Sequence, residues 1–152
     1  MPQKLKIIFI WILFLAFPIF VRADTLGQRA YFFIDSSYDL NKREQTSAVL
    51  IGISPKLYFY VDEDWWNSQN IYQQADIKNA INFLASEFDN KIYPTLTTTF
   101  GSEWKPGIDN DERITILIHP MMEDAGGYFN NGDEYPKIQN PKSNEREMLY
   151  FN

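Results

Sequence analysis

The chain has 152 residues, 16% of them aromatic, with no cysteine and a formal net charge of −6. Without cysteine it has no disulfides, so a packed core or bound ions must hold the fold together. We expect no nucleic-acid partner, because phosphate contacts need a basic face and 20 acidic residues stand against 14 basic ones.

Residues 1–23 have the three-part layout of a secretory signal peptide. A basic head with Lys4 and Lys6 precedes an apolar run, residues 7–20, and the small residue Ala23 ends the segment. The run of 14 residues is short for a bilayer core, which takes about 20. We therefore expect cleavage after Ala23 and a protein that is secreted or held in the cell envelope. The open alternative is an uncleaved anchor, in which case this segment alone contacts a membrane.

Residues 24–66 are predicted to be a β-rich lead-in region. Three runs rich in β-branched and aromatic residues predict a small antiparallel meander: Arg29–Asp35, Thr46–Ile53 and Lys56–Asp62. Such a meander buries little surface alone, so it is expected to pack on the second half of the chain. The adjacent Trp65 and Trp66 then have two interpretations. They either close the sheet against a helix or offer a stacking platform for a sugar ring.

A helix is predicted for residues 75–92, where apolar side chains recur at steps of three and four: Ile77, Ala80, Ile81, Leu84, Phe88 and Ile92. Pro94 opens a second, short helix that ends at Gly101. A buried strand is predicted at residues 113–118, then a long loop, then a strand at residues 147–151. This order of elements is typical of an α+β or α/β layered domain. We expect the α+β class, with a mixed sheet and helices.

Two isolated features could bind a metal ion. His119 is the only histidine, so it cannot form a two-histidine site, and its alternatives are a core residue or a lone ligand or catalytic group. Asp109 and Asp111 are candidate calcium ligands, since alternate carboxylates in a loop suit hard cations. Arg113 stands where an EF-hand loop needs an oxygen donor, so the other interpretation is that both aspartates cap the turn.

Other catalytic signals are incomplete. The acid pairs Glu123-Asp124 and Asp133-Glu134 could serve as a glycosidase's carboxylates, although adjacent loop acids are more often solvated charge. The sequence has no Gly-x-Ser-x-Gly turn and no Walker-type phosphate loop. The residues alone therefore contain no full catalytic set.

Several separated blocks in the second half nevertheless resemble a known family. LASEFDNKIYPTLTTTFGSEWKPGIDNDERITILIHP, GGYFNNGDEYP and NPKSNEREMLYFN are similar to the stretch that precedes the zinc motif in secreted HExxH metallopeptidases of the hyicolysin-like kind. The resemblance implies that residues 71–152 are the N-terminal, incomplete part of a zincin-like catalytic domain. In that family the next element is a helix with His-Glu-x-x-His, whose histidines bind zinc and whose glutamate is the general base.

The resemblance also implies where a peptide or protein substrate would bind. The strand before the zinc helix borders the cleft, so the residues expected to contact substrate are Met148, Leu149, Tyr150 and Phe151. The zinc motif is absent from this sequence. We therefore expect zinc and peptide-bond hydrolysis in the full-length protein, and neither zinc nor catalytic residues in this chain. The alternative is a non-catalytic exported module that binds glycan or protein through Trp65, Trp66 and a tyrosine-rich surface.

Overall fold

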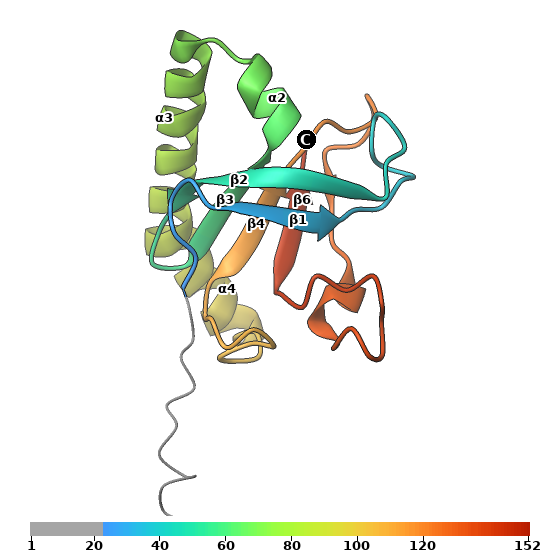
Figure 1. Cartoon of the computed structure of the whole chain (residues 1–152). Helices are drawn as coiled ribbons and strands as arrows, with labels where there is room; N and C mark the ends of the chain where they lie inside the picture. Colours follow the sequence, from blue (N-terminus) through green and yellow to red (C-terminus); the bar gives the residue numbers. More distant parts are fainter. Residues whose placement is uncertain (1–22) are drawn as a thin grey trace, which may run out of the picture.

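The computed structural model describes residues 23–152, so the expected signal peptide lies outside the described residues apart from Ala23. One six-stranded mixed sheet, in the order β1-β2-β3-β4-β6-β5, forms the body of the fold (Figure 1). The strands are β1 (Arg29–Phe33), β2 (Gln45–Ile53), β3 (Leu57–Asp62), β4 (Ile114–Ile118), β5 (Gly127–Tyr128) and β6 (Met148–Phe151). The prediction of an α+β fold with a mixed sheet is confirmed.

The main helices lie between β3 and β4 in the chain. They are α2 (Glu63–Ser68), α3 (Ile71–Glu87), the π-helical turn η1 (Phe88–Ile92) and α4 (Tyr93–Phe100); the 3₁₀ turn η2 (Asn131–Glu134) comes later. α3 starts ahead of the predicted residue 75 because Asn70 and Gln73 form a capping box, each side chain binding the other's backbone N–H. Pro94 opens α4 and Gly101, with φ of 87°, ends it, as predicted.

The sheet is antiparallel in its first half and parallel in its centre. β1, β2 and β3 form the predicted meander. β3 then pairs in parallel with β4, and β4 with β6, while β5 pairs antiparallel with the last residues of β6. The lead-in region and residues 71–152 therefore share one sheet, because β3 of the first pairs along its length with β4 of the second.

Helices cover one face of this sheet. Phe59 of β3 and Ile116 of β4 point to that face, where they meet Trp66 of α2 and Ile81 of α3 in one buried cluster. The register of β2 against β3 shifts between Leu50 and Gly52, and α3 packs tightly at Gly52: a Cβ atom there would lie 2.8 Å from Cγ2 of Ile81. Glycine at this position thus lets the helix pack directly on the strand.

Strands and loops cover the opposite face. β1 and β2 cross in front of β4 and β6 in Figure 1, so the sheet is strongly curled. The second buried cluster accordingly joins Phe32 and Leu50 of the meander to Leu117 of β4 and Tyr150 of β6. β3 is buried on both faces along its whole length and forms the centre of the fold.

The outer edge of β1 is closed by a side chain rather than by a strand. Asn144 Oδ1 accepts a hydrogen bond from the N–H of Phe33 at 2.8 Å, and Asn144 Nδ2 donates to the carbonyl of the same residue at 2.9 Å. Asn144 is itself held by Asp133, whose Oδ1 accepts its backbone N–H at 2.8 Å. The loop before β6 is thereby attached to β1, which lies at the opposite end of the strand order.

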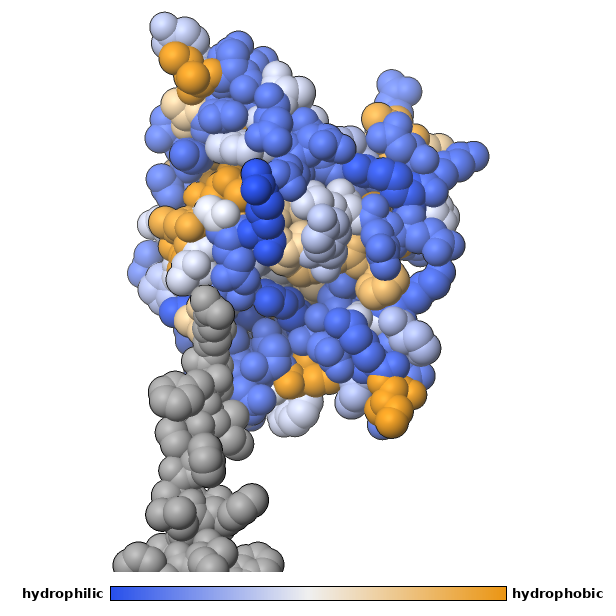
Figure 2. Space-filling model, in the orientation of Figure 1, coloured by the Kyte–Doolittle hydropathy of each residue, from blue (hydrophilic) through white to orange (hydrophobic). Residues whose placement is uncertain are grey.

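Hydrophobic residues on the surface lie in small patches separated by hydrophilic surface on the face that Figure 2 shows. Among the most exposed are Tyr72 and Phe83 of α3, Phe100 of α4, and Trp104 after it. Within residues 23–152 no helix combines the length and the apolar character that crossing a bilayer would take.

Candidate functional site at the carboxyl ends of the parallel strands

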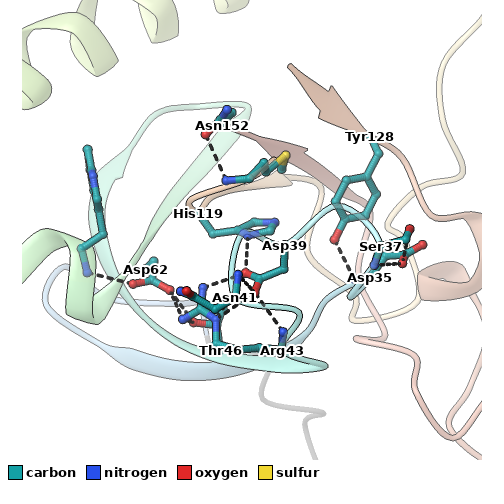
Figure 3. Close-up of polar contacts among 12 residues, drawn as sticks. Asp35, Ser37, Asp39, Asn41, Arg43, Thr46, Asp62, His119, Tyr128 and Asn152 are labelled. Carbon is teal, nitrogen blue, oxygen red and sulfur yellow. Dashed lines mark hydrogen bonds and ion pairs between the residues drawn. The ribbon is translucent and has the colours of Figure 1, made fainter. Parts of the chain in front are cut away.

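The carboxyl ends of the three parallel strands meet at one edge of the sheet. Asp62 ends β3, His119 comes directly after β4 and Asn152 directly after β6, and Figure 3 shows the three side chains close to one another at this edge. In open sheets with parallel strands, this edge is where ligands most often bind. We therefore treat it as the candidate functional site.

The loop between β1 and β2 crosses over this edge and contributes further charges. The N–H of Leu40 donates to the carbonyl of Pro120 at 3.1 Å, and the N–H of Met122 donates to that of Tyr38 at 2.8 Å. These bonds place Asp39 and Arg43 of the loop at the ends of β3 and β4, which are distant from the loop in the sequence.

Arg43 joins two buried carboxylates. Its Nη2 lies 2.8 Å from Oδ2 of Asp39, and its Nη1 lies 2.9 Å from Oδ2 of Asp62. Asp62 also accepts a 2.6 Å hydrogen bond from the hydroxyl of Thr46 and caps α2 by accepting the N–H of Trp65 at 2.8 Å. Both carboxylate oxygens of Asp62 are thus hydrogen-bonded.

These contacts determine the ionisation states of Asp39 and Asp62. Burial alone would raise the pKa of Asp39, but the hydrogen bonds and the charge of Arg43 outweigh it and hold the pKa below its usual value. Burial alone would also raise the pKa of Asp62, but the contacts with Thr46, the N–H of Trp65 and Arg43 together lower it below its usual value. Both aspartates therefore carry a negative charge at neutral pH, with one guanidinium between them.

His119 lies against this pair with its side chain fully buried. Its Nδ1 is 3.3 Å from Oδ2 of Asp39. Burial lowers the pKa of His119 more than the nearby Asp39 raises it, so the imidazole is neutral at neutral pH. Because a carboxylate only accepts, Nδ1 carries the proton and Nε2 keeps a lone pair. Among the residues that the structure describes, Nε2 has no hydrogen-bond partner.

A neutral imidazole oriented by a carboxylate is the arrangement found in metal ligands and general bases. The surroundings of His119 argue against both uses here. Its ring is packed edge-on against Tyr128 and Tyr150, with centroids 6.2 and 6.3 Å away, and its side chain has 0% exposure. A substrate cannot reach Nε2 in this conformation. We name Asp39, Arg43, Thr46, Asp62 and His119 the carboxyl-end cluster and assign it the role of fixing the β1–β2 loop.

The buried histidine predicts how stability changes with pH. The unfolded chain takes up a proton at His119 near pH 6.5, whereas the folded chain, with its lowered pKa, does so only at more acidic pH. The free energy of unfolding should therefore fall as pH drops below 6.5, by at most about 1.4 kcal/mol per pH unit. Urea unfolding at several pH values measures this slope.

The His119→Gln variant supplies the control for that slope. It contains no histidine, so the fall in its free energy of unfolding from about pH 6.5 to 5 should be smaller than that of the wild type by the contribution of His119. The buried carboxyls of Asp133 and Glu147, whose pKa burial raises, are present in both proteins and do not change this difference. Equal slopes for the wild type and the variant would contradict a buried, neutral His119.

The outer edge of β5 is the one free strand edge beside the carboxyl-end cluster within the described chain. The N–H of Asn152 donates to the carbonyl of Gly126 at 3.2 Å. The backbone N–H and carbonyl groups of Gly126 and Tyr128 therefore point toward β6. Those of Gly127, between them, point away from the sheet. A Cβ atom on Gly127 would lie 2.5 Å from the carbonyl oxygen of Tyr150, so this close pairing requires glycine.

β6, the strand expected to contact substrate, lies inside the sheet. Met148 and Tyr150 are 1% and 0% exposed in the core, and Leu149 and Phe151 are packed on the helix face. On its outer side β6 is paired with β5 at Tyr150 and Phe151. The structure thus places the free edge on β5, and these four side chains do not line an open cleft.

Asp109 and Asp111 make the contacts of turn caps. Asp109 Oδ1 accepts the N–H of Asp111 at 3.0 Å, and Asp111 Oδ1 accepts the N–H of Arg113 at 3.1 Å. Asn110 between the aspartates has a φ of 61°, which asparagine tolerates. Calcium binding by this pair stays a prediction, and within residues 23–152 no three His, Cys, Asp or Glu side chains gather as a metal site.

The remaining candidates are dispersed. Glu123, Asp124 and Glu134 are exposed on the loops between β4 and β6. Asp133 is buried and accepts a 2.6 Å hydrogen bond from the hydroxyl of Tyr150, so it organises its own loop. With one member of the set buried in the core and the others in solvent, these acids lack the facing arrangement that a glycosidase needs.

The tryptophan pair lies against the sheet. Trp66 is 9% exposed and belongs to the core cluster beneath α2, and Trp65 packs against the same cluster. The interpretation as a sugar platform is therefore wrong, and the pair closes the sheet against the helices.

Sequence reasoning missed most of the carboxyl-end cluster. Asp39, Arg43 and Thr46 lie in or beside a polar stretch that is typical of a solvated loop, and nothing local marks them as buried. Two weak signals were present: Asp62 precedes α2 at the position of a helix cap, and His119 ends an apolar strand.

Compared with known proteins, the sequence matches no family model and no curated protein.

Proposed function

We propose that this chain is the N-terminal part of an exported zinc metallopeptidase-like protein that hydrolyses peptide bonds. In it the chain supplies the central sheet and an edge strand that holds the peptide substrate. The family resemblance of residues 74–152 supports the reaction class. The structural observation that carries the substrate-binding role is the free outer edge of β5 beside the carboxyl ends of the parallel strands.

The edge of β5 suits an extended peptide. The outward N–H and carbonyl of Gly127 can form a pair of main-chain hydrogen bonds with a peptide, which adds a strand to the sheet. Gly127 carries no side chain that would obstruct the approach. Phe129 comes next, 55% exposed, and can contact a substrate side chain. This moves the expected substrate contact from Met148–Phe151 of β6 to residues 127–129.

The described residues do not fit a zinc site of their own. His119 is the single histidine, its buried ring packs edge-on against Tyr128 and Tyr150, and its Nδ1 is bound to Asp39. In the proposal the zinc ligands and the general base belong to another part of the protein, and this chain's residues bind and orient the peptide. Residues 1–152 alone are therefore expected to hydrolyse no peptide.

The proposal predicts that blocking the β5 edge lowers peptidase activity. In the whole exported protein, Gly127→Val should push β5 away from Tyr150, because its Cβ would lie 2.5 Å from that residue's carbonyl oxygen. Losing two hydrogen bonds of about 1 kcal/mol each corresponds to a roughly 30-fold lower kcat/KM on an unfolded protein substrate. Product release from such a substrate measures it.

Gly126→Val is the matched control, since a Cβ atom at Gly126 meets nothing within 4 Å. It should leave kcat/KM within about threefold of the wild type. Equal losses of kcat/KM in both variants would contradict the proposal that the β5 edge binds the peptide. A whole protein that binds glycan or protein without hydrolysing peptides would refute the reaction class and favour the binding-module alternative.

A further inference from the structure

Asp24, the first residue after the expected cleavage point, is built into the fold by its side chain. Its Oδ2 pairs with the guanidinium of Arg146 and accepts a 2.9 Å hydrogen bond from the hydroxyl of Tyr60. Its Oδ1 accepts a 2.8 Å hydrogen bond from Gln28. The Asp24 side chain is only 9% exposed. The residue before it, Ala23, is exposed.

The backbone nitrogen of Asp24 has an equally specific position. It lies 3.2 Å from the hydroxyl oxygen of Tyr58, and that hydroxyl donates a 2.6 Å hydrogen bond to Oδ2 of Asp111. A cavity of about 350 Å³ adjoins this point, and its lining includes Ala23, Asp111 and Glu112. Acidic side chains therefore lie beside the position where the mature chain is expected to begin.

We propose that removal of residues 1–23 creates an α-ammonium group on Asp24 that docks on the Tyr58 hydroxyl beside Asp111, making this position a built-in site for the processed N-terminus. The inference rests on the expected cleavage after Ala23 and goes beyond the proposed peptidase function. Cleavage turns a neutral amide N–H into a cation with three donors. One donor keeps the bond to Tyr58, and the positive charge faces the carboxylate that Tyr58 already binds.

The charged groups around this nitrogen come from two segments. The turn before β4 contributes Asp111 and Glu112 as acids and Arg113 as a base. The loop before β6 contributes Arg146, which is already paired with the Asp24 carboxylate. Arg113 lies 3.2 Å from both Tyr58 and Asp111 and opposes the ammonium. Glu112 lies 3.9 Å from Lys105, so Asp111, which is bound to Tyr58, is the acid that favours the ammonium.

Docking would fasten the start of the mature chain to both halves of the fold. Tyr58 lies on β3, at the centre of the sheet, and Asp111 precedes β4. Arg146 leads into β6. Asp24 thus contacts β3 and the loop before β6 directly, and through the Tyr58 hydroxyl it is linked to the turn before β4. Cleavage strengthens this attachment, because a hydrogen bond donated by an ammonium is stronger than one donated by a neutral amide.

The test uses the full chain produced in a bacterial host that exports it. Mass spectrometry of the recovered protein should give an N-terminus at Asp24. Competitive acylation between about pH 6 and 10 then measures the pKa of its α-amine, which we expect to lie about one unit above the roughly 7.7–8.0 of a free α-amine. The experiment does not measure peptidase activity, so its outcome is independent of the proposed function.

Three variants make the test specific. Asp111→Asn, which keeps the turn-capping oxygen, and Tyr58→Phe should each return the α-amine pKa to the free range. Glu112→Gln is the matched control, because the Glu112 carboxylate points to Lys105 at 3.9 Å, whereas Tyr58 binds Asp111. This variant should leave the α-amine pKa raised. An N-terminus at another residue overturns the proposal, as does an α-amine with an ordinary pKa or a raised pKa that Asp111→Asn leaves unchanged.

Discussion

Replacing Arg43 with methionine is expected to lower the free energy of unfolding by about 3 kcal/mol. The substitution keeps the length of the side chain but leaves Asp39 and Asp62 buried without a partner cation, with side-chain exposures of 0% and 2%. Breaking a buried ion pair costs about 3–5 kcal/mol, and we expect the lower end because Arg43 itself is 26% exposed. Urea denaturation of the variant and the wild type measures the difference.

Lys42→Met is the matched control for this prediction. It removes one positive charge from the same loop, but Lys42 is exposed and the structure gives it no ion pair among residues 23–152. Its unfolding free energy should stay within about 0.5 kcal/mol of the wild type. If Arg43→Met were equally mild, Asp39 and Asp62 would not depend on the guanidinium, and the carboxyl-end cluster would not hold the loop.

Replacing Phe59 with alanine should have the largest effect on stability, a loss of about 4 kcal/mol in the free energy of unfolding. Phe59 is 0% exposed at the centre of β3 and packs in the cluster beneath the helices. Removing its ring leaves a cavity that the neighbours on β4 and α3 cannot fill without moving. The midpoint of urea unfolding reports this loss.

The same experiment tests whether the lead-in region and the rest of the chain unfold as one unit. β3 belongs to the first region and pairs with β4 of the second, so fluorescence and far-UV circular dichroism should shift together in Phe59→Ala. Phe83→Ala is the control, since Phe83 is 70% exposed on α3. Separate transitions for the two probes would show that the regions are independent.

Much of the fold could be predicted because its long elements carry strong local patterns. The meander, β4, β6 and the helix around Ile81 each have an apolar run or a helical repeat that can be recognised within a short stretch of sequence. β5 could not be predicted, since Gly127 and Tyr128 alone have no strand pattern and become a strand only by pairing with β6. α2 could not be predicted because its six residues are too few to show a helical repeat of apolar side chains.

The candidate site was much less predictable than the fold. Asp39, Asp62 and His119 come from three distant segments, and they meet because the sheet curls and the β1–β2 loop crosses its edge. That crossing depends on an antiparallel bridge between Asp39 and Met121, which no local pattern encodes. β5 adds itself outside β6 in the same long-range way, so no local pattern shows that β6 lies inside the sheet.

The Asn144 amide has a consequence for how the outer edge of β1 can pair with another molecule. By presenting an acceptor and a donor to Phe33, it imitates the peptide group of a neighbouring strand and occupies the place where another molecule's strand would add. This edge of the sheet is thereby protected at Phe33 against the addition of a strand from another molecule, whereas β5 at the opposite end of the strand order has no strand on its outer side within residues 23–152.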